Sequence, residues 1–194
     1  MNNRTKIIAV TGMLGALSSV LMLFELPIPL VPSFIKMDFS ELPIIIAGFL
    51  YGPLYGSAAA LIKILLHLVM KGTSTGGVGE LANLAGSLAY MLPAALIYQH
   101  RKSRSAAILG LAVGTVITSI VMVLLNTYVT FPLYIRVFGM TEEVIIGMGH
   151  AVNPLVNDML TMMLCSVLPF NLFKYGVVSL ITVLVYKRLS VILK

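Results

Sequence analysis

The sequence predicts an all-α integral membrane protein with six transmembrane helices, and three observations carry that prediction. Of the 194 residues, 59% are hydrophobic and only 10% are charged, and the mean hydropathy is +1.01. A soluble domain carries about 25% charged residues, so these few charges do not suffice for a water-exposed surface. Uncharged segments recur at about the 20-residue length that crosses a bilayer, and basic residues stand at their ends. This pattern excludes a soluble domain and a disordered chain, and the single cysteine excludes an internal disulfide framework.

The first half of the chain predicts three helices and a loop. A charge-free run after Lys6 predicts a retained first helix over about 5–24. Loop 1, about 25–38, holds three prolines but is apolar, so we expect it to fold over a pocket or dip into the bilayer. The next apolar stretch is too long for one span, and Gly52-Pro53 divides it into helices over about 39–51 and 53–70.

The second half predicts three more helices. After a glycine-rich connection at 72–79, the uncharged stretches 81–100 and 105–135 predict helices over about 80–100 and 105–132. The last helix is predicted over about 169–189, beginning at Pro169. The segment between, about 140–167, mixes polar and apolar residues and predicts a re-entrant or interfacial segment, with a seventh span as the alternative.

The basic residues predict a cytoplasmic N-terminus. Six helices place three Lys or Arg residues on the outer side and eight on the inner side, and such an excess marks the cytoplasmic side. The inner eight are Arg4, Lys6, Arg101, Lys102, Arg104, Lys187, Arg188 and Lys194. All seven carboxylates fall outside or at that interface.

Several chemistries are missing from the chain. It has no G-x-x-x-x-G-K-[S/T] motif for nucleotide phosphates, no H-E-x-x-H motif and no run of basic residues for nucleic acid. No nucleophile has an evident base nearby. We therefore expect no enzymatic activity, no metal and no resident cofactor, and any ATP hydrolysis must occur on another subunit.

Polar residues at membrane depth are the candidate binding residues, because they are costly there. Asn126 lies within the fifth predicted helix, and Asn171 and Lys174 lie three residues apart on one face of the last. Together they offer amide groups and an ammonium that suit a flat ligand edged with heteroatoms. The alternative is hydrogen bonding between helices, with Lys174 extending to the interface.

Lys63 and His67 share a face of the third predicted helix. One interpretation is that Lys63 is a functional group that faces the bundle interior or a partner protein. The other is that it forms a buried ion pair with one of the outer-side carboxylates. The glycine-rich stretch 72–79 is either a phosphate-binding nest or a flexible connection.

Small residues line one face of the first helix. Gly12 and Ala16, like Thr11 and Gly15, have the small-x-x-x-small spacing that lets helices approach closely, and Ala9 lies on the Gly12 face. The pattern predicts either docking to another membrane subunit or packing within this chain.

Four segments resemble the substrate-binding S component of energy-coupling factor (ECF) vitamin transporters, specifically the riboflavin type. They are KMDFSELPIIIAGFLYGPLYG (36–56), GGVGELANLAG (76–86), LLNTYVTFPLY (124–134) and LPFNLFKYG (168–176). The resemblance spans nearly the whole chain. It implies a six-helix S-component bundle with a pocket open to the outside and covered by loop 1.

The resemblance also implies roles for residues and partners. Asn126, Asn171 and Lys174 match the polar residues that bind riboflavin, and Met37 and Phe39 would supply pocket walls. Riboflavin would be the transported ligand. The partners would be a transmembrane coupling subunit of the EcfT type and two ATPase subunits of the EcfA types. The coupling subunit would contact the small-residue face of the first helix.

The residues also leave two other classes of protein open. A self-sufficient, proton-coupled secondary transporter would use Lys63 or His67 as a relay. A membrane enzyme of lipid chemistry would need acidic clusters, whereas the carboxylates of this chain are dispersed.

Overall fold

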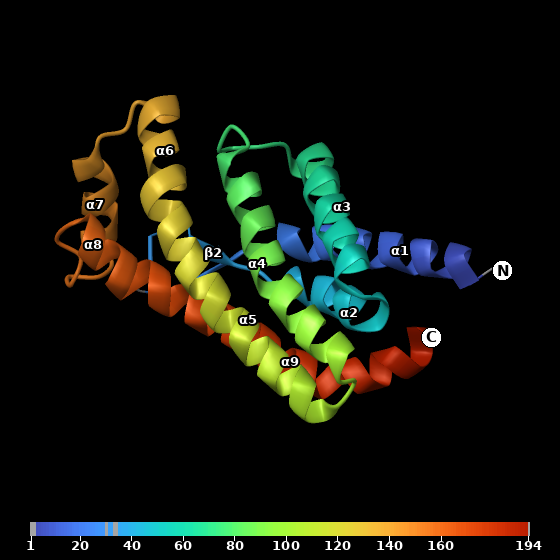
Figure 1. Ribbon diagram of the computed structural model, residues 1–194. Coiled ribbons are helices and arrows are strands. Elements are labelled where there is room, and N and C mark those ends of the chain that lie inside the picture. Colours follow the sequence, from blue (N-terminus) through green and yellow to red (C-terminus); the bar gives the residue numbers. More distant parts are fainter. Residues whose placement is uncertain (1–2, 30, 33–34, 194) are drawn as a thin grey trace.

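The computed structural model describes residues 3–29, 31–32 and 35–193, and its architecture is a helical bundle with one long connecting loop (Figure 1). Five helical segments of the described residues are long and apolar enough to cross a membrane, and a shorter apolar helix of 11 residues lies among them. The five long segments are Asn3–Leu23, Pro53–Lys71, Val78–His100, Arg104–Phe138 and Met159–Arg188. The all-α membrane fold predicted from the sequence is confirmed.

The first four helices pack closely together because small residues line their contacts. They are α1 (Asn3–Leu23), α2 (Glu41–Tyr51), α3 (Pro53–Lys71) and α4 (Val78–His100). Gly52, at φ 98°, makes the tight turn between α2 and α3, and Pro53 opens α3. A Cβ at Gly15 of α1 would lie 2.8 Å from the Cβ of Ile62 on α3, so only glycine allows this approach.

Two continuous helices make up most of the second half, and both are longer than the sequence predicted. One runs through α5 (Arg104–Leu125), the π-helical turn η1 (Asn126–Thr130) and α6 (Phe131–Phe138). The other runs through α8 (Met159–Met162), the π-helical turn η2 (Met163–Val167) and α9 (Leu168–Leu193). The predicted end near 132 and the predicted start near 169 are therefore wrong, because the helices continue through Pro132 and Pro169.

The π-helical turns explain why these prolines do not end their helices. A proline lacks the N–H for the carbonyl four residues earlier and its ring crowds that carbonyl, which a widened turn relieves. The carbonyl four residues before Pro169 belongs to Cys165, and it accepts a hydrogen bond from Asn153 Nδ2 at 3.0 Å. Side-chain hydrogen bonds of this kind are invisible to a reading of local sequence.

The segment predicted over 140–167 divides into two parts. Its first part holds α7 (Glu142–His150), which spans only about 14 Å at 1.5 Å per residue and is too short to cross a bilayer. Its second part belongs to the last long helix. Ile145 of α7 and Val156 pack against Phe131 and Met162 in a small separate core, so residues 142–158 cap the ends of α6 and α8.

Loop 1 crosses from α1 to α2 and packs against α9. Its short strands β1 (Leu26–Pro27) and β2 (Lys36–Met37) pair antiparallel, with Leu26 opposite Met37. Val31 and Met37 are buried against Phe170 of α9. Residues 30 and 33–34 of the predicted loop, 25–38, lie outside the described residues.

The segments that carry the residues predicted to be cytoplasmic lie at one end of the bundle. The N-terminus of α1, the α4–α5 turn and the C-terminal end of α9 lie at the right and lower side of Figure 1, away from the α3–α4 and α6–α7 connections at its top. Of the eight residues predicted to be cytoplasmic, Lys194 lies outside the described residues. The direction of the bundle in the membrane stays a prediction.

Candidate ligand-binding site

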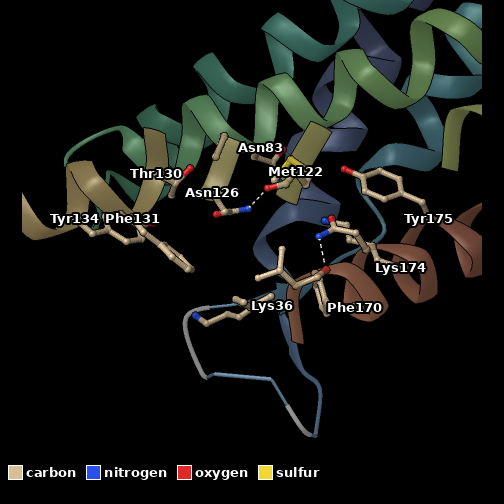
Figure 2. Close-up of a pocket in the computed structure, with 15 residues that line it drawn as sticks. Lys36, Asn83, Met122, Asn126, Thr130, Phe131, Tyr134, Phe170, Lys174 and Tyr175 are labelled. Carbon is tan, nitrogen blue, oxygen red and sulfur yellow. Dashed lines mark hydrogen bonds between the residues drawn. The ribbon is translucent and has the colours of Figure 1, made fainter. Parts of the chain in front are cut away.

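A cavity of about 140 Å³ lies among α4, η1, α9 and loop 1, and all three predicted polar residues line it (Figure 2). Asn126 comes from the first position of η1, while Asn171 and Lys174 come from the first turns of α9. Asn126 lies 45 or more residues before the other two in sequence, and the two long helices bring the three together. π-Helical turns are frequent at functional sites, and here one begins at Asn126 and the other ends four residues before Asn171.

Both asparagines present an oxygen to the cavity. Asn126 Nδ2 donates to the carbonyl of Met122 at 2.7 Å, and Asn171 Nδ2 donates to the carbonyl of Val167 at 2.8 Å. A carbonyl only accepts, so the nitrogen of each amide must face the helix backbone. The Oδ1 atoms are thereby left as hydrogen-bond acceptors for a ligand.

Lys174 lines the cavity and also forms an ion pair with Asp38 of loop 1. Its Nζ lies 2.9 Å from Asp38 Oδ2, and the two side chains are 7% and 6% exposed. Burial alone would raise the pKa of Asp38, but the ammonium groups of Lys174 and Lys63 outweigh burial and lower that pKa to about 2. Asp38 therefore stays ionised and ties loop 1 to α9.

Met37 and Phe39 lie beside the cavity rather than on its wall. Both pack in the apolar cluster around Phe170, and Phe170 is the member of that cluster that lines the cavity. Of the described loop 1 residues, Ile35 and Lys36 are on the wall. The alternation of side chains along β2 turns Met37 toward the cluster, which the sequence alone did not indicate.

A second, more polar cavity of about 340 Å³ adjoins the first and shares Lys36, Gly79, Asn83 and Tyr134 with it. Glu25 joins loop 1 to the end of α3 at its edge, 2.7 Å from Lys36 Nζ and 2.8 Å from Lys71 Nζ. Burial opposes ionisation of Glu25, but both lysines stabilise its charge and lower its pKa. The glycine-rich connection borders this cavity through Thr73 and Thr75, whose hydroxyls donate to Glu80.

Lys63 forms a buried pair, as one of the two interpretations of the sequence proposed. Its Nζ lies 3.0 Å from Glu41 Oε1, and both side chains are fully buried. His67, one turn away on α3, is buried at the second cavity, and its ring nitrogens have no hydrogen-bond partner among the described residues. The two residues share a face but do not act as a hydrogen-bonded pair.

The small-residue face of α1 divides into two kinds of position. Thr11 and Gly15 are buried against the rest of the bundle. Ala9 is exposed, Gly12 and Ala16 are partly exposed, and a Cβ at Gly12 would meet nothing within 4 Å. The predicted docking residues therefore lie on the open side of the helix.

Sequence reasoning missed Asp38 and Asn83. The sequence placed Asp38 with the outer carboxylates. Its pairing with Lys174 joins residues 136 positions apart, so no local pattern reveals it. Asn83 was available from the same rule that selected Asn126, since it is an amide in the uncharged stretch 81–100.

Membrane-length helices around a cavity with a few converging polar groups define a membrane protein that binds a small molecule. The chain matches the family described as "ECF transporter, substrate-specific component" over residues 6–186, and it belongs to that family. It is accordingly a multi-pass membrane component of a transporter rather than an enzyme.

Relatives and a solved structure agree with that membership. The riboflavin transporter RibU of Staphylococcus aureus (strain TCH60) is 32% identical over 100% of this chain and 99% of its own length. The riboflavin transporter FmnP of Bacillus subtilis (strain 168) is 31% identical over 96% of this chain and 93% of its own. A structure described as the S component of a bacterial ECF transporter superimposes with a TM-score of 0.76 at 31% identity, covering 99% of both chains.

Proposed function

We propose that this chain is the riboflavin-binding subunit of an ECF transporter for vitamin uptake in the bacterial cytoplasmic membrane. The observation that carries the proposal is the convergence of Asn126, Asn171 and Lys174 on one cavity. The riboflavin transporters named above, which align over nearly the whole chain, support the choice of ligand.

The chemistry of the cavity suits the flavin ring. A flavin has one edge on which an N–H lies between two carbonyl groups, and the rest of its ring system is flat and largely apolar. The Oδ1 atoms of Asn126 and Asn171 are acceptors for the N–H, and Lys174 can donate to a carbonyl oxygen. Phe131 and Phe170 supply apolar surface for the ring.

Partners would supply the energy for transport. The chain has no nucleotide-binding motif, and we propose that an EcfT-type coupling subunit docks on the open face of α1 at Ala9, Gly12 and Ala16. Two EcfA-type ATPases would hydrolyse ATP. Lys63 does not suit a proton relay, because it is fully buried and hydrogen-bonded to several acceptors.

Purification tests the ligand assignment. Riboflavin is yellow and fluorescent, so protein extracted in mild detergent from cells grown with the vitamin should be yellow, and stripped protein should quench added riboflavin. Thiamine at the same concentration serves as a competitor that should have no effect. A colourless preparation that also fails to quench riboflavin would refute the assignment.

A further inference from the structure

Asn83 of α4 is a further polar residue at the site. It lines both cavities, and Figure 2 draws it among the residues that surround the first. Its Oδ1 accepts a hydrogen bond from Lys63 Nζ at 2.6 Å. Asn83 thus connects the buried Lys63–Glu41 ion pair with the ligand cavity.

The buried network sets the orientation of this amide. Lys63 Nζ also donates to Ser87 Oγ at 2.6 Å and to Glu41 Oε1 at 3.0 Å. An ammonium has donors and no acceptor, so the oxygen of Asn83, and not its nitrogen, must face Lys63. Among the described residues nothing accepts from Asn83 Nδ2, which leaves its N–H groups for a ligand.

The other two cavity amides are held in the opposite sense. Backbone carbonyls take the Nδ2 groups of Asn126 and Asn171, so these residues offer acceptors. The cavity therefore has acceptors from η1 and α9 and a fixed donor from α4. A ring edge that presents acceptor, donor and acceptor in a row needs both kinds of group.

We propose that Asn83 is a specificity-determining residue that donates from Nδ2 to a ring carbonyl oxygen of the ligand, and that Lys63 is the positioning residue that fixes its donor face. The inference rests on the proposed function, in which the ligand is a flavin. It gives Lys63 a function at the site without any contact between Lys63 and the ligand.

The substitution Asn83→Asp tests the donor directly. It keeps the shape and the oxygen for Lys63 but replaces the N–H groups with a second acceptor. Riboflavin affinity, measured by fluorescence quenching, should fall about tenfold or more, the factor expected when a buried carbonyl loses its donor. Asn157→Asp is the matched control, because Asn157 is exposed and lies outside both cavities, and it should bind as the unsubstituted protein does.

Thio analogues separate a direct contact from a general disturbance. A thiocarbonyl accepts hydrogen bonds weakly, so either 2-thioriboflavin or 4-thioriboflavin should bind the unsubstituted protein more weakly than riboflavin. In the Asn83→Asp protein that difference should largely disappear. Equal loss of affinity for riboflavin and both analogues, or no loss at all, would overturn the proposal. If the Asp variant does not fold, Asn83→Leu removes the same donor and is judged by the same criteria.

The role of Lys63 is tested in a variant that leaves no buried charge unpaired. Lys63→Met combined with Glu41→Gln frees the amide of Asn83 to rotate, so discrimination between riboflavin and the thio analogue should fall toward that of Asn83→Asp. Unchanged discrimination in a folded double variant would refute the positioning role. Failure of the unsubstituted protein to bind any flavin would instead refute the proposed function.

Discussion

Lys63 and Lys174 are both buried and both hold carboxylates from residues 38–41, yet their surroundings differ. Lys63 Nζ is within 3.0 Å of acceptors on Glu41, Asn83 and Ser87, which matches the three hydrogens of an ammonium. Lys174 donates to Asp38 at 2.9 Å and lines the cavity. The same residue type therefore has no donor left for a ligand in one half of the bundle and free donor capacity in the other.

The difference teaches how this fold separates stability from binding. The pair on α2 and α3 is fully buried, and its charges are matched entirely by groups of the protein. The pair on loop 1 and α9 lies beside a cavity that Lys174 itself and residues of η1 line. A buried lysine thus signals a binding site only when its hydrogen-bond donors exceed the acceptors around it.

The largest expected effect is on folding. Lys63→Met would leave Glu41 buried without its cation, which costs about 3–5 kcal/mol of unfolding free energy. Thermal unfolding in detergent would report this as a large drop in midpoint. Adding Glu41→Gln should restore most of the lost stability. If Lys63→Met alone is as stable as the unsubstituted protein, Glu41 does not depend on Lys63 to balance its charge.

The pair on α9 should instead affect binding. Lys174→Met combined with Asp38→Asn removes both charges, so stability should stay close to that of the unsubstituted protein while riboflavin binding weakens by about 1.5–3 kcal/mol, the range for a bond to a charged group. Fluorescence titration and thermal unfolding of the same sample separate the two effects. Loss of stability with unchanged affinity would reverse the assigned roles of the two lysines.

Acid should release loop 1. The pKa of Asp38 is about 2 when folded and about 3.9 when unfolded, so its stabilising contribution is complete above about pH 4 and disappears as the pH falls through about 2. The contribution amounts to about 2 kcal/mol. Unfolding midpoints between pH 5 and pH 3 should fall more steeply for the unsubstituted protein than for the Lys174→Met/Asp38→Asn variant. Parallel curves would contradict the ionised state of Asp38.

The smallest expected effect on stability belongs to the open face of α1. Gly12→Leu should change unfolding free energy by less than about 0.5 kcal/mol, because nothing lies near its Cβ. Gly15→Leu is the matched buried position and should destabilise by about 1–3 kcal/mol or more. If α1 docks to a coupling subunit, Gly12→Leu should still bind riboflavin but lose energised uptake. Normal uptake by this variant would place the docking surface elsewhere.

Much of the fold followed from the sequence because hydropathy and membrane thickness determine where helices lie. Asn126, Asn171 and Lys174 could be selected because polar groups at membrane depth need a reason to be there. The continuation of helices through Pro132 and Pro169 could not be foreseen, because π-helical turns and the Asn153 hydrogen bond compensate for the prolines. The pairing of Asp38 with Lys174 depends on how loop 1 packs, and no local pattern encodes it.

Fluorescence titration of riboflavin against the unsubstituted protein and the Asn126→Ala/Asn171→Ala variant tests the central claim most directly. Each lost amide should cost about 1–3 kcal/mol, so we expect quenching at one riboflavin per protein and an affinity weaker by about thirtyfold or more in the variant. Equal affinity for both proteins, with both shown to be folded, would contradict the account and place the binding site away from this cavity.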